Sequence, residues 1–480
     1  MTLVSAFGDD ALGRLDAVGV TEAIASGAVS RAEVVQAAIA RTEKVNPQLN
    51  GLAFEAFGAA RARAASPTRY GGFFDGVPTF VKDNAAVEGM PTMEGTDAWE
   101  PRPEPAHGDF ARVYLSTGLV ALGKSQLSEF GFSAVAEHAR LGAVRNPWNV
   151  DHTAGASSSG AGAFVAAGAV PIAHANDGGG SIRIPASCNG LVGLKPSRGR
   201  LPLDADMRQM PIRIVANGVV TRSVRDTAAF YCEAEKVWRS PKLPPIGDVT
   251  RPGRARLRVA VFTKSVKREC SPEVREHTLR TADLLERMGH RVEYLDAPPV
   301  PVSFIDDFLL YWALLSFALV RGGKSRFGAT FDRGKLDNLT LGLEAFAAAN
   351  LRRLPLAVAR LATLRRRMLP RVRDYDVLLT PTLAEVPPLV GHLDPTADYD
   401  QIIERLVDWV AFTPLQNVTG DPAISLPLGQ SVEGLPVGMM LSARMGREKT
   451  LLELAYEIEE AVPFPLITSA VTADSQARTR

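Results

Sequence analysis

Two Gly/Ser-rich loops carry the side chains of this chain that best suit nucleophilic chemistry. The first, ASSSG at residues 156–160, surrounds Ser157, and the second, GGGS at residues 178–181, ends at Ser181. Three successive glycines let the backbone turn its N–H groups toward one point, which suits an anion. A serine at the end of such a nest can attack a carbonyl beside its own oxyanion hole. The pattern therefore favours acyl transfer over a purely structural turn.

The segment between the two loops brings the serines toward the same region. A small-residue helix is predicted from about 159 to 168, and an apolar strand from 170 to 176. The helix advances about 15 Å and the strand returns about 20 Å. Contact between Ser157 and Ser181 is therefore compatible with the spacing. The serine cluster also suits a helix N-cap, a role that does not exclude catalysis.

Lys82 is the candidate base. It ends the apolar strand PTFVK at residues 78–82, at the same type of sheet edge as the serine loops. A lysine that loses solvent has a lowered pKa and can accept a proton. A lone lysine is usually a solvated surface residue, so the spacing alone leaves both interpretations of Lys82 open.

Other chemical signals are weak. The seven histidines form no HxH or HExxH pattern, so no metal site is expected. Gly118–Ser125 (GLVALGKS) matches a phosphate-binding loop, but a helix is predicted before it and a strand between its glycines. His174 is predicted inside a strand, and Cys188 is predicted to be a buried small residue. A Ser-His-Asp triad stays an alternative, although neither serine loop contains GxSxG.

The elements that must position these residues alternate between helix and strand, which predicts an α/β fold with helices on both faces of a sheet. Helices are expected at 9–48, 50–65, 109–118 and 271–290, and strands at 78–82, 120–125, 256–262, 290–295, 376–382 and 423–429. One domain is expected over residues 1–480. It would comprise N-terminal helices over 1–65, a core with the catalytic motifs over 70–250, a helical insertion over 300–373 and the rest of the core over 374–465.

Composition is typical of a globular protein, with 46% hydrophobic and 22% charged residues. The net charge of +1 gives no field that favours nucleic acid. Three irregularly spaced cysteines favour a reducing compartment, and the N-terminus has no signal-peptide pattern, so the cytoplasm is expected. The apolar run 308–320 is too short to span a bilayer and is predicted to be a buried helix. The Arg-rich stretch 352–373 is predicted to be the solvated face of an amphipathic helix.

Taken together, these segments resemble the amidase signature family. The family pattern, close to GGSSGGS, a small-residue helix and GTDxGGSxRxPA, corresponds to GASSSGA and ANDGGGSIRIPA in the same register. GVPTFVKDN, GKSQLSEF, RNPWN, GLVGLKPSRGR and NVTGDPAISLPLG also match, so the resemblance covers about residues 9–465. AHANDGGGSIRIPAS is most similar to the subgroup that contains nylon-oligomer cyclic-dimer hydrolases. The fold implied is a large mixed β-sheet covered by helices on both faces, with a helical insertion.

The resemblance implies a Ser-Ser-Lys triad. In this triad Ser181 is the nucleophile, Ser157 is the bridging serine after a cis Ala156–Ser157 peptide bond, and Lys82 is the base. Further site residues are the oxyanion-hole amides of Gly178, Gly179, Gly180 and Ser181, and the supporting residues Ser158, Asp177 and Arg183.

Two departures from the family pattern affect this site. Ala156 and Ser159 stand where the family has glycines, and their side chains are expected to stiffen the loop and narrow the pocket. AND replaces GTD, with Asp177 kept in place.

The function implied is hydrolysis of a carboxylic acid amide through a Ser181 acyl-enzyme, with no metal or organic cofactor. The expected partner is a small-molecule amide, without nucleic acid or a membrane span, and a homodimer is compatible with the sequence. One alternative is an ammonia-releasing amidotransferase subunit, although such subunits often carry IRQPA where Ile184 gives IRIPA here. The other is a catalytically silent binding protein on the same scaffold. The apolar segment 308–320 is a candidate lining of the acyl pocket.

Overall fold

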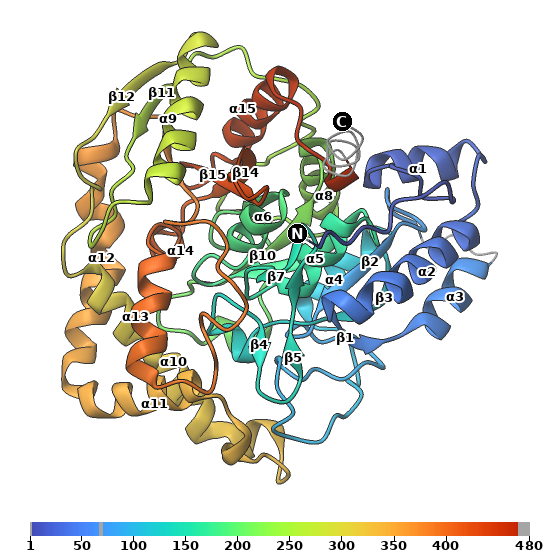
Figure 1. Ribbon diagram of the computed structural model, residues 1–480, viewed down its shortest axis with the longest axis horizontal. Helices are drawn as coiled ribbons and strands as arrows, with labels where there is room; N and C mark the ends of the chain where they lie inside the picture. The colour runs from blue at the N-terminus through green and yellow to red at the C-terminus, as the bar shows by residue number, and fades with distance from the viewer. Residues whose placement is uncertain (1, 67–70, 469–480) are drawn as a thin grey trace.

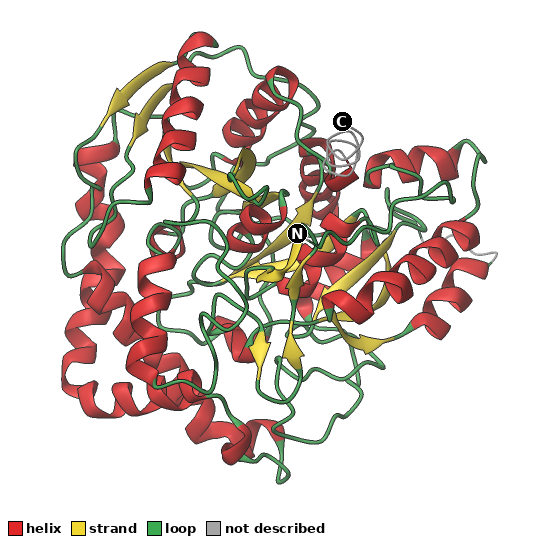
Figure 2. Cartoon of the chain, viewed as in Figure 1, coloured by secondary structure: helices red, strands yellow, loops and turns green. Residues whose placement is uncertain are grey.

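The computed structural model describes residues 2–66 and 71–468, in which a mixed eight-stranded β-sheet forms the core (Figures 1 and 2). Its strand order is β12-β11-β13-β15-β14-β9-β10-β8. The strands are β8 (Ile172–Asp177), β9 (Val192–Lys195), β10 (Ala216–Thr221), β11 (Arg258–Val261), β12 (Arg291–Tyr294), β13 (Val377–Pro381), β14 (Ala423–Gln430) and β15 (Pro436–Ala443). Strand β11 runs parallel to β12 and β13, and the other neighbours pair antiparallel. The predicted mixed α/β sheet is confirmed.

A separate three-stranded sheet carries Lys82. Its order is β1-β3-β2, built from β1 (Leu52–Glu55), β3 (Val120–Ser125) and β2 (Pro78–Lys82). Strand β2 lies beside β8, the edge strand of the large sheet. Side chains join the two strands: Thr79 Oγ1 donates to the Ile172 carbonyl at 2.9 Å, and the Lys82 amide donates to His174 Nδ1 at 3.2 Å. The strand that ends at Lys82 is thus fixed against the strand that leads to Ser181.

Helices surround both sheets, with α2 and α3 beside the three-stranded sheet and α10 to α13 on the opposite side of the molecule (Figure 1). The helices are α1 (Ala17–Ala25), α2 (Arg31–Leu49), α3 (Phe57–Ala65), α4 (Asp109–Ser116), α5 (Ser159–Ala167), α6 (Arg183–Asn189), α7 (Ala205–Arg208), α8 (Val224–Val237), α9 (Pro272–Arg287), α10 (Phe304–Phe327), α11 (Asn338–Asn350), α12 (Leu354–Val372), α13 (Tyr399–Trp409), α14 (Pro414–Thr419) and α15 (Glu448–Ala461). Short strands β4 (Glu137–His138), β5 (Gly142–Ala143), β6 (Arg145–Asn146) and β7 (Asn149–Thr153) form two small hairpin sheets.

The N-terminal region differs from its predictions at two places. The segment expected to be helical over 9–48 forms two helices, α1 and α2, separated at 26–30, and residues 9–16 are not helical. The helix expected over 50–65 begins only at Phe57, because Leu52–Glu55 forms strand β1. This four-residue segment pairs antiparallel with β3 and alternates between half-buried and exposed positions. Pairing across the sheet decides the structure of so short a segment, which local helix propensity does not determine.

The segment that matches a phosphate-binding loop, Gly118–Ser125, leads into a strand. Residues from Val120 onward are β3, and Lys124 is fully buried.

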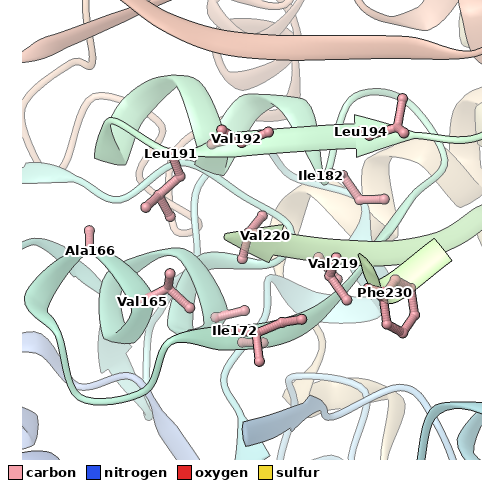
Figure 3. Packing of buried hydrophobic residues seen from close by; sticks show 14 of the residues in the cluster. Val165, Ala166, Ile172, Ile182, Leu191, Val192, Leu194, Val219, Val220 and Phe230 are labelled. Atoms are coloured by element: carbon pink, nitrogen blue, oxygen red, sulfur yellow. The ribbon is translucent and has the colours of Figure 1, made fainter. Parts of the chain in front are cut away.

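The core holds the ends of the two serine loops in place. Figure 3 shows Val165 of α5, Ile172 of β8, Val192 of β9 and Val219 of β10 packed together, and each of them is fully buried. Helix α5 starts just after the first serine loop, and β8 ends just before the second. Every residue of α5 is buried, and its small side chains allow close approach. A Cβ at Gly160 would lie 2.2 Å from a backbone oxygen of the neighbouring chain segment, so only glycine fits there.

The segment 300–373 is helical, as predicted. The apolar run 308–320 lies within α10, and α12 buries four residues along one side while its arginines at 365–367 are exposed. None of the helices in the described residues is long and apolar enough to cross a membrane. The assignment of a single domain over 1–480, with 300–373 as an insertion, stays a prediction, and its outermost residues lie outside the described ranges.

Candidate active site

Lys82 and Ser157 meet in the buried interior, where β2 ends and the loop before α5 begins. Lys82 Nζ donates to Ser157 Oγ at 2.7 Å, and the two residues are 0% and 2% exposed. Burial lowers the pKa of Lys82 to about 7, although the charges of Asp177 and Glu94 act in the opposite direction. A lysine with this pKa is largely neutral just above neutral pH, and a neutral amine can accept a proton.

Ser181 lies two residues before α6, directly after the three glycines that follow β8. Its carbonyl accepts a hydrogen bond from Ser158 Oγ at 2.5 Å, which ties the two serine loops together. The peptide bond between Ala156 and Ser157 is cis, as the resemblance implied. In the described residues the hydroxyls of Ser157 and Ser181 form no hydrogen bond with each other, so the structure places them in adjoining loops without a direct link.

The backbone N–H groups of the glycine loop differ in whether a side chain already accepts a hydrogen bond from them. The Gly180 N–H donates to Asp177 Oδ1 at 2.8 Å, so this amide is already engaged. The N–H groups of Gly178, Gly179 and Ser181 have no side-chain acceptor among the residues that the structure describes. Gly180 adopts φ +139°, and a Cβ there would lie 2.4 Å from Thr413 Oγ1. Only glycine suits this position, both for its backbone conformation and for the space around it.

Asp177 and Arg183 form a buried ion pair that holds this loop in place. Arg183 donates through Nη2 to Asp177 Oδ1 at 2.8 Å and through Nε to Oδ2 at 2.9 Å, and both side chains are fully buried. Asn417 Nδ2 donates to the same Oδ1 at 2.8 Å. Burial disfavours the Asp177 carboxylate, but Arg183 and Asn417 outweigh it and hold its pKa at about 2. Arg183 is thus committed to the loop and not free to bind a ligand.

Three polar residues at the site were missed in the sequence. Asn176 Oδ1 accepts from Lys82 Nζ at 2.7 Å, Asn417 contacts Asp177 and Arg183, and Thr413 Oγ1 donates to the Gly179 carbonyl at 2.6 Å. The replacement of GTD by AND was the available signal for Asn176. Asn417 opens the matching segment NVTGDP, but nothing in that segment indicates which residue it contacts.

An apolar pocket adjoins Ser181. Its lining is Gly131, Phe132, Ser133, Ala134, Ala156, Gly179, Ser181, Ile184, Phe304, Ile305, Phe308, Leu309, Trp312, Ile403, Leu406, Val407, Val410, Ala411 and Pro414. No charged side chain lines it in the described part of the chain. Of the apolar segment 308–320, Phe308 and Trp312 reach the pocket and Phe317 does not. Ala156 also lines it, whereas Ser159 Oγ donates to the Gly155 carbonyl at 2.6 Å and ties the loop to itself.

The described residues offer no cluster of metal ligands, and the histidine and cysteine near the site are buried. Within residues 2–66 and 71–468, no cluster of three His, Cys, Asp or Glu side chains could hold a metal ion. His174 lies fully buried in β8, where desolvation keeps its pKa well below the usual value. Cys188 is buried in α6, and burial raises the pKa of its thiol.

Comparison with known proteins gives consistent results along the chain. A family model described as Amidase matches residues 33–452. The protein AmiC of Mycobacterium leprae (strain TN) is 66% identical over 467 residues, which cover 97% of this chain and 99% of that protein. The 6-aminohexanoate-cyclic-dimer hydrolase of Pseudomonas sp. (strain NK87) is 32% identical, covering 94% and 95%. The solved structure of a 6-aminohexanoate cyclic dimer hydrolase superposes with a TM-score of 0.83 at 29% identity, covering 95% of this chain and 98% of the other.

Proposed function

This chain belongs to the Amidase family and is a hydrolase of amide bonds, and on that premise we propose that Ser181 forms an acyl-enzyme with its substrate. In this proposal Ser157 relays a proton and Lys82 is the base. The observation that carries it is the 2.7 Å contact of Lys82 Nζ with Ser157 Oγ, in an interior where burial brings the lysine pKa to about 7. An amine of that pKa is matched to proton transfer near neutral pH.

The proton path runs from Ser181 through Ser157 to Lys82. Neutral Lys82 takes the proton of Ser157 Oγ while Ser157 takes that of Ser181 Oγ, which attacks the substrate carbonyl carbon. Rotation of the Ser181 hydroxyl toward Ser157 completes the path when substrate binds, because catalytic hydrogen bonds often tighten only in that complex. When the C–N bond breaks, Ser157 passes the proton to the leaving amine and is reprotonated by Lys82. Water then attacks the ester at Ser181 and passes a proton through Ser157 to Lys82. As the acid leaves, the same path returns a proton to Ser181 Oγ.

The oxyanion is held by backbone amides of the glycine loop. The N–H groups of Gly178, Gly179 and Ser181 have no side-chain acceptor among the described residues and are the proposed donors. Gly180 supports them, since its own N–H holds Asp177. Loss of a single oxyanion donor typically lowers the rate by about 10²–10³. Supporting roles fall to Ser158, which holds the Ser181 carbonyl, and to the Asp177–Arg183 pair.

The substrate acyl group is proposed to lie in the apolar pocket beside Ser181. Phe308 and Trp312 line this pocket, which has no charged side chain among the described residues. Ile184 also lines it, at the position where amidotransferase subunits often carry glutamine. An uncharged, apolar pocket gives no partner to the ammonium and carboxylate of a free glutamine substrate. The pocket thus supports hydrolysis of a small-molecule amide over ammonia release in an amidotransferase complex.

The proposal is tested by replacing the nucleophile. Ser181→Ala is expected to abolish hydrolysis of acyl p-nitroanilides and covalent labelling by a serine-directed phosphonate. Ser133→Ala removes another hydroxyl from the same pocket and is expected to keep the label. Labelling of Ser181→Ala at the wild-type rate would overturn the assignment, and absence of label on the wild type would favour a catalytically silent binding protein.

The free cysteines bear on the compartment in which the protein works. The described chain has three free cysteines, Cys188, Cys232 and Cys270, which supports a reducing compartment such as the cytoplasm. No nucleic-acid partner is proposed, because the net charge is only +1. A homodimer stays compatible with the sequence, and size-exclusion chromatography with light scattering would decide the oligomeric state.

A further inference from the structure

Asn176 contacts the base of the proposed triad directly. It is the penultimate residue of β8 and is 5% exposed. Lys82 Nζ donates to its side-chain Oδ1 at 2.7 Å and makes a longer contact of 3.5 Å with its backbone oxygen. Together with Ser157 Oγ at 2.7 Å, these atoms are the hydrogen-bond partners of Nζ among the described residues. One residue therefore supplies two of the three partners.

A second asparagine holds the Asn176 amide in this orientation. Asn84 lies two residues after Lys82, and its Oδ1 accepts from Asn176 Nδ2 at 3.1 Å. In return, Asn84 Nδ2 donates to Asn176 Oδ1 at 3.3 Å. If the Asn176 amide were turned over, its NH₂ group would face the Lys82 nitrogen and lose its acceptor, Asn84 Oδ1. The amide pair thus keeps an oxygen, not a nitrogen, directed at Lys82.

The geometry around Nζ suits a neutral amine. A neutral lysine has two N–H groups and one lone pair, whereas the ammonium form has three N–H groups. In the neutral form, the two oxygens of Asn176 can take both N–H groups of Nζ. Nζ then no longer donates to Ser157 Oγ, and its lone pair is left for the Ser157 hydroxyl. This is the arrangement a base needs before it accepts a proton from Ser157.

We infer that Asn176, held by Asn84, is a positioning residue that aims the Lys82 lone pair at Ser157. This inference rests on the proposed roles of Lys82, Ser157 and Ser181. The uncharged side chain is part of the inference, because a carboxylate at this position would form a direct ion pair with Nζ and favour the protonated lysine. Asn176 therefore fixes the direction of Nζ without holding a proton on it.

The charged groups around Lys82 are already engaged elsewhere or make no hydrogen bond with Nζ. From β8, Asp177 pairs with Arg183, and desolvation keeps the pKa of His174 well below its usual value. Asp83, which follows β2, lies 3.6 Å from Lys124 of β3. The remaining titratable group, Glu94 in the loop after β2, has its pKa raised to about 7 by burial and forms no hydrogen bond with Nζ in the described residues. An aspartate in place of Asn176 would be the first carboxylate to contact Nζ directly.

The decisive experiment is the pH profile of Asn176→Asp. With an acyl p-nitroanilide as substrate, the acid limb of kcat/KM is expected to move up by about 1–3 pH units, the shift that a contacting opposite charge typically produces. Asn217→Asp is the matched control, because Asn217 pairs with Asn176 in the β8–β10 ladder and does not contact Nζ. A clearly smaller shift is expected there. An unmoved acid limb in Asn176→Asp, or an equal shift in the control, would overturn the inference.

Asn84→Ala keeps the test decisive if substitution of Asn176 prevents folding, because Asn84 is only half-buried. Loss of the amide pair is expected to lower kcat about 3- to 10-fold with little change in KM, while phosphonate labelling of Ser181 persists. An unchanged kcat would contradict the role of the pair. Failure of the triad itself is distinguished by Ser181→Ala: if that variant still hydrolyses substrate, the proposed function fails, whatever Asn176 does.

Discussion

Asp177 and Arg183 form a two-point ion pair in which neither side chain is exposed to solvent. Arg183 Nη2 lies 2.8 Å from Asp177 Oδ1, and Nε lies 2.9 Å from Oδ2. The amides of Gly180 and Ile182 donate to the same carboxylate, so the pair anchors the loop on both sides of Ser181. The position of Ser181, the proposed nucleophile, thus depends on a buried charge pair beneath its loop.

Substitution of Asp177 tests whether its ion pair with Arg183 holds the loop in place. Asp177→Asn leaves the Arg183 guanidinium buried without an anion, and breaking a buried pair in this way typically costs about 3–5 kcal/mol. The free energy of unfolding in urea is expected to fall by that order, together with kcat. Arg280→Ala, which breaks an exposed pair with Glu276 on α9, is the control and is expected to change stability by less than about 1 kcal/mol. Equal stability of Asp177→Asn and wild type would contradict the anchoring role.

Burial of Lys82 predicts how the free energy of unfolding depends on pH. The pKa of Lys82 is about 7 in the folded protein against an ordinary 10.5, so between these values the unfolded chain binds a proton that the folded chain does not. The free energy of unfolding contributed by Lys82 therefore rises with pH across this window, by at most about 1.4 kcal/mol per pH unit. Lys82→Met should lack that rise and should be inactive. Urea unfolding of both proteins at several pH values from 7 to 10.5 measures the difference.

Lys449 provides the control for the same experiment. Lys449→Met removes an exposed lysine and is expected to keep both activity and the wild-type pH dependence of stability. If Lys82→Met followed the wild-type curve throughout, the lysine would not be neutral in the folded protein.

Substitution by alanine is expected to have different effects at the adjacent residues Gly179 and Gly180. At Gly180, φ +139° and a 2.4 Å approach to Thr413 Oγ1 leave no space for a Cβ, so Gly180→Ala is expected to lower stability and labelling by the phosphonate. At Gly179 the nearest atom is Phe308 Cζ at 3.6 Å, an ordinary contact. Gly179→Ala should fold normally and raise KM for bulky acyl groups, because the new methyl group faces the pocket. Similar stability of the two variants would count against this account of the loop.

Acyl preference should follow the residues that line the pocket. Trp312→Ala and Phe308→Ala enlarge it, so kcat/KM for acyl p-nitroanilides is expected to shift toward longer or bulkier acyl groups. Phe317→Ala, in the same helix but outside the pocket lining, is the matched control and should leave the profile unchanged. An identical profile in all three variants would place the acyl group elsewhere.

The sequence was sufficient to predict the triad candidates because their signals are local. Ser181 follows three glycines, Ser157 precedes a small-residue helix, and Lys82 ends an apolar strand; each pattern lies within a few residues. The strands β2, β3, β8 and β11 and the helices α4, α5 and α9 follow from the same kind of local periodicity, and the structure has them at or within about three residues of their predicted bounds.

The parts that escaped prediction depend on contacts between distant segments. Asn417 reaches Asp177 across the chain, and Asn176 acts through a lysine on another sheet. Strand β1 exists because β3 pairs with it, and four residues carry too little periodicity to show this. The engagement of the Gly180 amide could not be foreseen either, since a glycine nest does not reveal which N–H a nearby carboxylate will take.

Lys82 ends a strand of the small sheet, whereas Ser181 lies in the loop after β8, the edge strand of the large sheet, and Ser157 lies just before α5. Side-chain hydrogen bonds, not a shared ladder, join β2 to β8. Separation of the two sheets would withdraw Lys82 from Ser181 while each sheet kept its own backbone pairing. Amide hydrolysis is therefore expected to report the docking between these two layers more sensitively than total secondary structure does, and to be lost at lower denaturant concentrations.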